Sequence, residues 1–282
     1  MRSVVRPQWS ARDAYLLCIG RVRDQDLRSR LNSVVEDVAE AAEAYSRHAE
    51  EATLHLVPQD VHVGGRVCGK EMRDVYSSRM VPRNSPGRPV YDGLLGLPDR
   101  GICPFCGHGR VSTLDHVLPK SLYPALAVVP DNLVGACRDC NSSKLDDAPT
   151  IAADAALHPY FDDVSNRRWL FARVVEKDGP ALDYFVQEVD GWSDETNARL
   201  RKQFMDLDLG RRYGIEATEL IAGQRKKLQV IFESRGRDGV REDLHLSAGS
   251  WKVHNRNCWQ AAGLEALGNS DWYCGGGFSM DM

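Results

Sequence analysis

The sequence predicts an α+β protein, in which a small unit of two strands and one short helix lies between mostly helical N- and C-terminal regions. Three patterns predict this architecture. Apolar residues recur at helical spacing early in the chain, two Cys-x-x-Cys pairs enclose two strand-like runs in the middle, and a hairpin pattern followed by helical stretches fills the last part. We therefore divide the chain into residues 1–65, 66–149 and 150–282.

The N-terminal region is predicted to hold two helices. Ser10 is a suitable N-cap and Asp13 stands in the capping-box position, which opens a short helix that ends near Gly20. A second, longer helix is predicted by one apolar face, made by Leu27, Leu31, Val34, Val38, Ala41 and Tyr45. We interpret this face as core or as a docking face for another helix rather than as a cofactor site.

More helical structure is predicted ahead of the cysteine pairs. Residues 70–81 favour a helix because four apolar or aromatic side chains fall on one side of it, namely Met72, Val75, Tyr76 and Met80. Several prolines and glycines then break regular structure, and residues 91–97 predict one short helical turn.

The two Cys-x-x-Cys pairs predict a structural zinc site. Four thiolates, from Cys103, Cys106, Cys137 and Cys140, close a tetrahedral coordination shell and leave no position open for chemistry. The alternatives are a chance match and a redox dithiol, although a redox motif would need only one of the two pairs.

The segment between the pairs is longer than the roughly 15 to 20 residues of a simple zinc ribbon, so it has to house additional structure. Residues 110–114 and 132–136 predict two antiparallel strands joined by a proline-rich loop, and residues 138–146 predict a short helix. The product is a β-β-α unit pinned by zinc at its open end.

Polar residues within this unit have complementary chemistry. Asp115 offers a hard carboxylate oxygen and Asn141 a neutral carbonyl oxygen, both of which suit Mg²⁺. His116 follows Asp115 but points to the opposite side of an extended strand, where it can act as a general base. The set predicts metal-assisted phosphodiester hydrolysis, because a cation neutralises the developing charge while a base deprotonates the attacking water.

The cysteine-flanked segment resembles an HNH endonuclease of the ββα-metal type with a four-cysteine zinc. On that resemblance Asp115 is the metal-binding Asp, His116 is the general base, and Asn132 is the central Asn that orients the loop carrying the base. Asn141 stands where the family has its last His, so the chain is similar to the H-N-N variant. The Asn oxygen keeps a ligand for Mg²⁺ or Mn²⁺ and weakens binding of softer metals.

Two lysines are predicted to contact phosphate. Lys144 follows Asn141 by one helical turn and shares its face, and Lys120 lies in the loop after His116. The predicted activity is therefore cleavage of DNA. Standalone HNH proteins of this size resemble components of bacterial defence against phage, either modification-dependent restriction or two-gene systems in which an ATPase is the partner protein, and this analogy implies a defence role.

Each of these residues also has a plain structural reading. An Asp-His pair at a strand end is often a surface pair, an Asn before an apolar run is often a turn former, and exposed lysines are common. The rival from another class is a non-enzymatic zinc-binding module that contacts nucleic acid or protein, which explains the cysteines but not Asp115, His116 and Asn141. A homing or mobile-element nuclease would need more basic, base-reading surface than the sequence offers.

The charge of the chain argues for weak intrinsic binding to nucleic acid. The formal net charge is −4, whereas a protein that binds DNA alone usually presents a basic face. Basic residues gather near the N-terminus and again between residues 199 and 227, with an acidic stretch between residues 36 and 51. We expect a partner protein to strengthen the binding.

The other cysteines are scattered and are interpreted as reduced thiols, namely Cys18, Cys68, Cys258 and Cys274. Cys68 could join His62 and His108 as an alternative metal ligand, although the two pairs already complete a set of four. The sequence has no run of about 18 apolar residues and no signal-peptide order at its start, so we expect a cytoplasmic protein without a membrane span.

The C-terminal region is predicted to begin with a β-hairpin. Residues 169–175 and 182–189 alternate as strands do, around an Asp-Gly turn at residues 178 and 179. His158, which precedes the hairpin, is interpreted as structural.

Helices are predicted to follow the hairpin. Ser193 is a suitable N-cap for a helix stopped by Gly210, and the next helix ends before Gly236. A last helix is predicted over residues 251–267, followed by a flexible tail at residues 275–277. No catalytic motif is present here, so we interpret this region as a scaffold or as a surface for substrate or partner.

Overall fold

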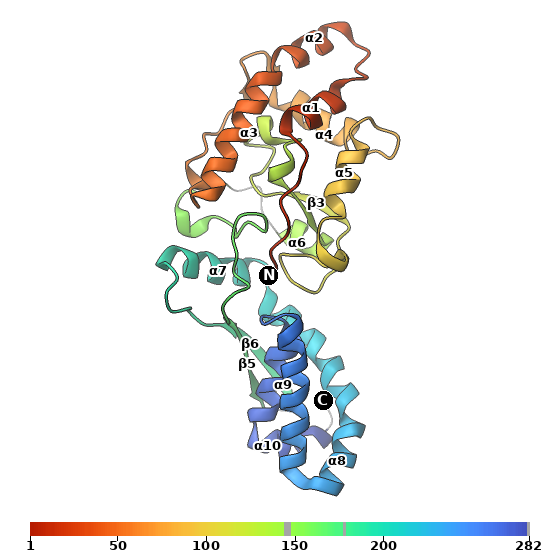
Figure 1. The fold of residues 1–282 in the computed structure, drawn as a ribbon, viewed down its shortest axis with the longest axis vertical. Helices are drawn as coiled ribbons and strands as arrows, with labels where there is room; N and C mark the ends of the chain where they lie inside the picture. Colours follow the sequence, from red (N-terminus) through yellow and green to blue (C-terminus); the bar gives the residue numbers. More distant parts are fainter. Residues whose placement is uncertain (144–147, 177–178, 281–282) are drawn as a thin grey trace. The chain divides into compact units, whose positions relative to one another are not determined.

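The computed structural model describes residues 1–143, 148–176 and 179–280, and it divides into two compact units (Figure 1). The first unit is Met1–Asp163 and the second is Val164–Met282. The protein is mixed α and β, with short antiparallel strand pairs among many helices. The predicted regions 1–65 and 66–149 lie together in the first unit.

Six helices shape the described part of the first unit: α1 Ala11–Ile19, α2 Gln25–Ser33, α3 Val35–Glu50, α4 Gly69–Arg79, α5 Arg88–Leu95 and α6 Arg138–Ser143. Ser10 caps α1 by accepting a hydrogen bond from the Asp13 N–H, as the capping pattern predicts. The single helix expected from Leu27 to Tyr45 is instead two, α2 and α3, which meet at Val34.

Local hydrogen bonds account for this break. Asn32 Nδ2 donates to Arg28 O at 2.7 Å and Ser33 Oγ donates to Arg30 O at 2.8 Å, so short polar side chains near the end of α2 compete with the backbone for carbonyls of that helix. The β-branched Val34 then leaves helical geometry, with φ −111° and ψ 16°. The predicted apolar face nevertheless continues across the break between α2 and α3, since Leu31, Val34 and Val38 are all buried.

The first unit also holds two short hairpins. β1 His62–Val63 pairs with β2 Val67–Cys68, and β3 Thr113–His116 pairs with β4 Leu133–Ala136. Single 3₁₀ turns connect the elements, namely η1 Leu54–Leu56, η2 Asp99–Gly101, η3 Pro124–Leu126, η4 Pro130–Asn132 and η5 Ala152–Asp154. The antiparallel hairpin between the cysteine pairs is confirmed, and α6 follows it.

The first strand of that hairpin starts later than residues 110–114. Arg110 pairs with Ile102 across the first cysteine knuckle, so the ladder with β4 begins only at Thr113, opposite Ala136. The shift places Asp115 and His116 inside the strand rather than after it, opposite Val134 and Leu133. Helix α5 packs against both strands, and α6 packs against β3.

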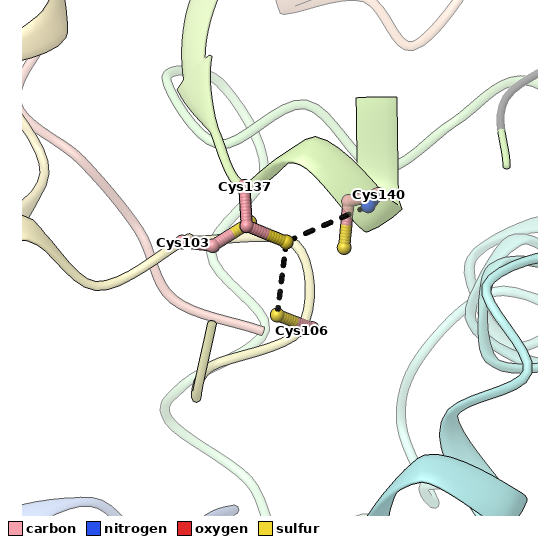
Figure 2. Close-up of side chains that lie close together, drawn as sticks. All are labelled: Cys103, Cys106, Cys137 and Cys140. Atoms are coloured by element: carbon pink, nitrogen blue, oxygen red, sulfur yellow. Dashed lines mark hydrogen bonds between the residues drawn. The ribbon is translucent and has the colours of Figure 1, made fainter. Parts of the chain in front are cut away.

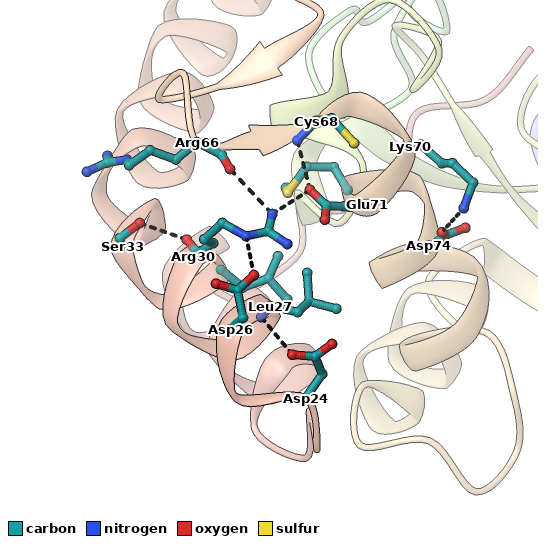
Figure 3. A network of polar contacts seen from close by, with 12 residues as sticks. Asp24, Asp26, Leu27, Arg30, Ser33, Arg66, Cys68, Lys70, Glu71 and Asp74 are labelled. Carbon is teal, nitrogen blue, oxygen red and sulfur yellow. Dashed lines mark hydrogen bonds and ion pairs between the residues drawn. The ribbon is translucent and has the colours of Figure 1, made fainter.

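A polar network ties α2 to the start of α4 (Figure 3). Arg30 donates to Asp26 on its own helix at 2.9 Å and to Glu71 on α4 at 2.8 Å, and Glu71 also accepts the Cys68 N–H at 3.0 Å. The bond from Arg30, more than any other contact, lowers the pKa of Glu71 to about 2. The network fixes the N-terminus of α4, whose other turns carry Met72, Val75 and Tyr76 into the core.

The second unit is built on one hairpin and its covering helices. β5 Leu170–Val175 and β6 Ala181–Val186 pair in the predicted antiparallel arrangement, with the turn residues 177 and 178 outside the described residues. The helices are α7 Asp194–Asp206, α8 Leu209–His254, α9 Trp259–Asn269 and α10 Asp271–Cys274, and a 3₁₀ turn, η6 Gly277–Ser279, follows α10. Helix α9 packs against α8 and the hairpin.

Two predicted helix ends are confirmed and one is wrong. Ser193 caps α7 by accepting from the Thr196 N–H, and Gly236, with φ 63° and ψ −160°, interrupts α8 where the sequence predicts an end. Such a φ is costly for any residue with a side chain. Gly210 does not stop α7, because the chain already leaves the helix at Asp208, in the left-handed region at φ 48°, and Gly210 lies within α8.

The last predicted helix is divided as well. Asn257 interrupts residues 251–267, since its Oδ1 accepts from Trp169 N at 2.9 Å and its Nδ2 donates to Arg167 O at 2.7 Å. The end of the described chain is also packed rather than loose, because the buried rings of Tyr273 and Phe278 meet with centroids 6.1 Å apart. Over residues 1–143, 148–176 and 179–280, no helix combines the length and apolar character that a bilayer crossing needs.

Candidate functional site

The four predicted zinc ligands converge in space (Figure 2). The Sγ atoms of Cys103, Cys106, Cys137 and Cys140 all lie within 4.8 Å of one another, and all four residues are buried. Cys106 Sγ and Cys137 Sγ are 3.8 Å apart. Two sulfurs bound to one tetrahedral zinc ion at Zn–S distances of about 2.3 Å are separated by about 3.8 Å, so this cluster fits a structural zinc site.

Backbone groups hold the sulfurs in place. Gly109 N donates to Cys106 Sγ at 3.3 Å, and Cys140 N donates to Cys137 Sγ at 3.5 Å. Position 109 requires glycine, because a Cβ there would lie 2.8 Å from Cys137 Sγ. Each knuckle therefore presents its thiols already aimed at a common centre.

Hydrogen bonds among the four thiols shift their pKa values in opposite directions. Hydrogen bonding with Cys103 lowers the pKa of Cys137 to about 6 and moves that of Cys106 well below its usual range. The pKa of Cys103 is raised by bonding to Cys106, and that of Cys140 is raised by bonding to Cys103. Donor thiols keep their protons while acceptors are stabilised as thiolates, and a shared Zn²⁺ would replace those protons.

The alternative ligands stay outside this cluster. Among the residues that the structure describes, one group of three or more His, Cys, Asp or Glu side chains converges closely enough to share a metal ion, and it consists of the four cysteines. His108 instead hydrogen-bonds Cys106 and lowers the pKa of that thiol, after the larger effect of Cys103. Cys68 caps α4 as part of a capping box with Glu71.

Strand β3 carries Asp115 and His116, both of which are almost fully buried. The His116 Nε2 atom lies 2.9 Å from Ala127 O. A carbonyl oxygen can only accept, so Nε2 carries the hydrogen, and in the neutral ring the lone pair is on Nδ1. The loop between β3 and β4 thus fixes both the ring orientation and the tautomer of His116.

Asn132 organises that same loop. Its side chain is fully buried, and its Oδ1 accepts from Leu118 N at 2.7 Å. Its Nδ2 donates to Leu118 O at 3.0 Å and to Leu126 O at 3.3 Å. One amide therefore closes the chain between β3 and β4 into a fixed loop, and Ala127, the acceptor for His116, comes directly after Leu126.

Contacts of the neighbouring residue Asp131 support the turn that holds Asn132. His158 Nδ1 accepts from Tyr160 N at 3.2 Å, so its Nε2 carries the hydrogen, 3.0 Å from Asp131 O and 2.8 Å from Tyr45 Oη. Asp131 also accepts from Arg6 Nη2 at 2.6 Å. These contacts bring the N-terminal segment, α3 and residues 158–162 onto the turn that holds Asn132.

Most of these contacts have no signal in the sequence. The sequence predicts a structural role for His158, and its buried contacts have that character. Asp131 and Arg6 gave no signal, because an acidic residue after a proline and an arginine near a chain start are ordinary surface features.

Helix α4 contributes a further side chain, Tyr76, for which the sequence predicts only a place on the apolar side of a helix. The ring of Tyr76 meets the ring of His116 edge to face, with centroids 4.5 Å apart and an interplanar angle of 71°. Lys120 Nζ lies 5.5 Å from the centroid of the same Tyr76 ring. The structure thereby groups Lys120, Tyr76 and His116.

The remaining predicted residues lie on or just after α6. Asn141 is half-buried on this helix, and its N–H donates to Cys137 O at 3.1 Å, so the second cysteine knuckle sets its position. Because α6 packs against β3, Asn141 and Asp115 belong to adjacent elements. Lys144 lies outside the described residues.

Comparisons with known proteins give one informative likeness. The chain is 32% identical over 187 residues to the protein Ea31 of Escherichia phage lambda, an alignment that covers 63% of this chain and 62% of Ea31. The aligned part is thus less than two thirds of that phage protein's length. No family model matches the chain, and no solved structure matches it.

Proposed function

We propose that the chain is a metal-dependent endonuclease that hydrolyses DNA phosphodiester bonds. The observation that carries the proposal is the bond from His116 Nε2–H to Ala127 O, within a hairpin and helix joined at the cysteine cluster. A histidine held in one tautomer by a backbone carbonyl is arranged as a general base, because its other ring nitrogen is the basic one. A purely structural zinc module has no need of a buried histidine at this position.

The donor set beside His116 suits a hard cation. Asp115 offers a carboxylate and Asn141 an amide oxygen, and neither is a soft ligand, so these residues would hold Mg²⁺ or Mn²⁺. Such an ion supplies charge neutralisation at the phosphate. Within the chain, His116 Nδ1 takes the proton of the attacking water, and Asn132 keeps the loop closed so that Ala127 O continues to orient the ring.

The comparison with known proteins bears on the biological setting of the proposed nuclease. The similarity to Ea31, a protein of phage lambda, supports a link to phage. The defence role and the ATPase partner stay predictions from the sequence. The formal net charge of −4 supports a need for help in binding DNA, because phosphate contacts dominate affinity.

A non-enzymatic zinc-binding module is the second candidate function. The observation that favours it is the closed cysteine cluster, which leaves no coordination position for substrate. It predicts that Asp115 and Asn141 can be exchanged without any effect beyond local stability.

The two candidates are separated by a cleavage assay. Purified protein is incubated with supercoiled plasmid, and with labelled duplex DNA, single-stranded DNA and RNA, in Mg²⁺, in Mn²⁺ and without added divalent metal. The nuclease proposal expects metal-dependent cleavage that an Asp115→Asn variant loses while it keeps its zinc. Cleavage that persists unchanged in Asp115→Asn, or that needs no metal, would contradict the proposed chemistry.

A further inference from the structure

Tyr76 stands apart from the other core residues of α4 because its ring has two polar neighbours. It is 8% exposed and packs edge to face on His116, while the Lys120 ammonium lies 5.5 Å from its ring centroid. An aromatic pair of this geometry and a cation over a ring are each attractive. One side chain from outside the β-β-α unit therefore contacts both the proposed base and a lysine of the loop.

The environment of Lys120 differs from that of other cations nearby. Lys70 on α4 pairs with Asp74 at 2.9 Å, and Arg88 on α5 pairs with Asp92 at 2.8 Å. Within the part of the chain that the structure describes, no carboxylate lies within ion-pair distance of Lys120. Its charge is held by an aromatic ring rather than neutralised, which leaves it available to an anion.

The position of Tyr76 is itself fixed. The Arg30–Glu71 ion pair anchors the first turn of α4 (Figure 3), and Met72 on the next turn is fully buried against Tyr15, whose hydroxyl lies 3.8 Å from the methionine sulfur. Helix α4 also packs against η3, in the loop that Asn132 closes. These contacts hold helix α4, and with it Tyr76, against the loop between β3 and β4.

We propose that Tyr76 is a positioning residue of the nucleic-acid site, whose ring sets the His116 imidazole and the Lys120 ammonium at a fixed separation so that one phosphodiester can meet both. The proposal rests on the proposed function for the role of His116, and it adds that the site extends beyond the hairpin and α6 to helix α4. It assigns the role to the ring and not to the hydroxyl. Tyr76→Phe should therefore preserve DNA binding and cleavage, whereas substitution of Tyr76 by an aliphatic residue of similar size should not.

A double-mutant cycle tests the coupling between Tyr76 and Lys120. The dissociation constant of a labelled DNA duplex is measured without divalent metal for wild type, Lys120→Ala, Tyr76→Leu and the double variant, over a range of salt. In the wild-type background we expect Lys120→Ala to weaken binding about fivefold and to lower the log–log salt slope by about one, as for a single phosphate contact. In the Tyr76→Leu background Lys120→Ala should change the dissociation constant by less than about twofold, because the aromatic ring no longer positions the lysine ammonium.

Two control variants guard against simple misfolding. Tyr76→Phe keeps the ring and should bind and cleave within about twofold of wild type, which Tyr76→Leu should not. Lys70→Ala removes a cation from the same helix, but one already paired with Asp74, and should leave both the affinity and its salt slope unchanged within about twofold.

Proton NMR adds a readout independent of activity, since Tyr76→Leu should abolish the ring-current displacement of the His116 ring protons and Tyr76→Phe should keep it.

The cleavage kinetics separate the two roles of the ring. Lys120→Ala should raise KM with little change in kcat, whereas Tyr76→Leu should raise KM and also lower kcat by about tenfold, because the base is no longer held.

Additive effects in the binding cycle, or equal activity of Tyr76→Leu and Tyr76→Phe, would overturn the inference. Coupled binding by a chain that cleaves nothing would refute the proposed function and leave the Tyr76 assignment standing. A wild-type chain that binds no DNA would overturn the assignment.

Discussion

Asn132 and Leu118 exchange two hydrogen bonds across the loop between β3 and β4. Leu118 N donates to Asn132 Oδ1 at 2.7 Å, and Asn132 Nδ2 donates to Leu118 O at 3.0 Å. The Asn132 amide thus hydrogen-bonds both backbone groups of Leu118, as a neighbouring strand would do in a sheet. The pairing depends on both ends of the amide, because one acts as acceptor and the other as donor.

The Asn132→Ala variant should be strongly destabilised. The change leaves a buried N–H and a buried carbonyl without partners, which costs about 2–4 kcal/mol in the free energy of unfolding. Chemical denaturation followed by tryptophan fluorescence measures the loss. Asn32→Ala, which removes an exposed bond to Arg28 O, serves as control and should cost less than about 0.5 kcal/mol. A loss under 1 kcal/mol for Asn132→Ala would refute the pinning role.

Metal analysis should find one zinc ion per chain. Cys106→Ser should lose it and unfold at lower denaturant concentration, because a thiolate is replaced by a poor zinc ligand. Cys68→Ser is the matched control, since Cys68 caps α4 and lies outside the cluster, and it should retain full zinc. Zinc lost equally from both variants would show that Cys68 is a ligand.

Glycine substitutions should act in opposite directions at two positions. Gly109→Ala should lower zinc affinity, because the added Cβ would lie 2.8 Å from Cys137 Sγ. Gly223→Ala, at an exposed position inside α8 with no atom within 4 Å of the new Cβ, should instead stabilise the chain by about 0.5–1 kcal/mol. Competition with a chromophoric chelator and thermal unfolding provide the two readouts, and equal zinc affinity for both variants would contradict the tight-packing account.

The Arg30–Glu71 pair should make stability depend on acid pH. Because the pKa of Glu71 is lowered from 4.5 to about 2, its stabilising contribution is complete above pH 4.5 and is lost as the pH falls towards 2. Glu71→Gln should therefore be less stable than wild type at pH 7, and the difference should shrink steadily below pH 4.5. Urea unfolding across that pH range measures it, and a difference that stays constant down to pH 2 would refute the assignment.

Much of the fold was predictable because its signals are local. Ser10 and Ser193 cap helices as their sequence context indicates, and the hairpin between the cysteine pairs follows from two strand-like runs in a segment too long for a simple zinc ribbon. The breaks were harder to foresee. The apolar face of α2 and α3 continues across Val34, so periodicity alone could not reveal that side-chain bonds from Asn32 and Ser33 end the first helix.

The candidate site shows the same limit. The four cysteines were predictable as a cluster because their spacing is itself the chemical requirement for zinc. Tyr76 was not, because an aromatic residue on the apolar side of a helix has the same pattern whether it packs on a leucine or on His116. Long-range contacts such as Asp131 with Arg6 leave no periodic signal at all.

The most direct test of the central claim compares two histidine variants on supercoiled plasmid in Mg²⁺. His116→Ala removes the proposed base, whereas His62→Ala removes an exposed histidine on β1 and serves as control. With zinc content and stability confirmed for both, we expect the cleavage rate of His116→Ala to fall by about 10²–10⁴-fold and that of His62→Ala to match wild type. Cleavage by His116→Ala at the wild-type rate would contradict the account.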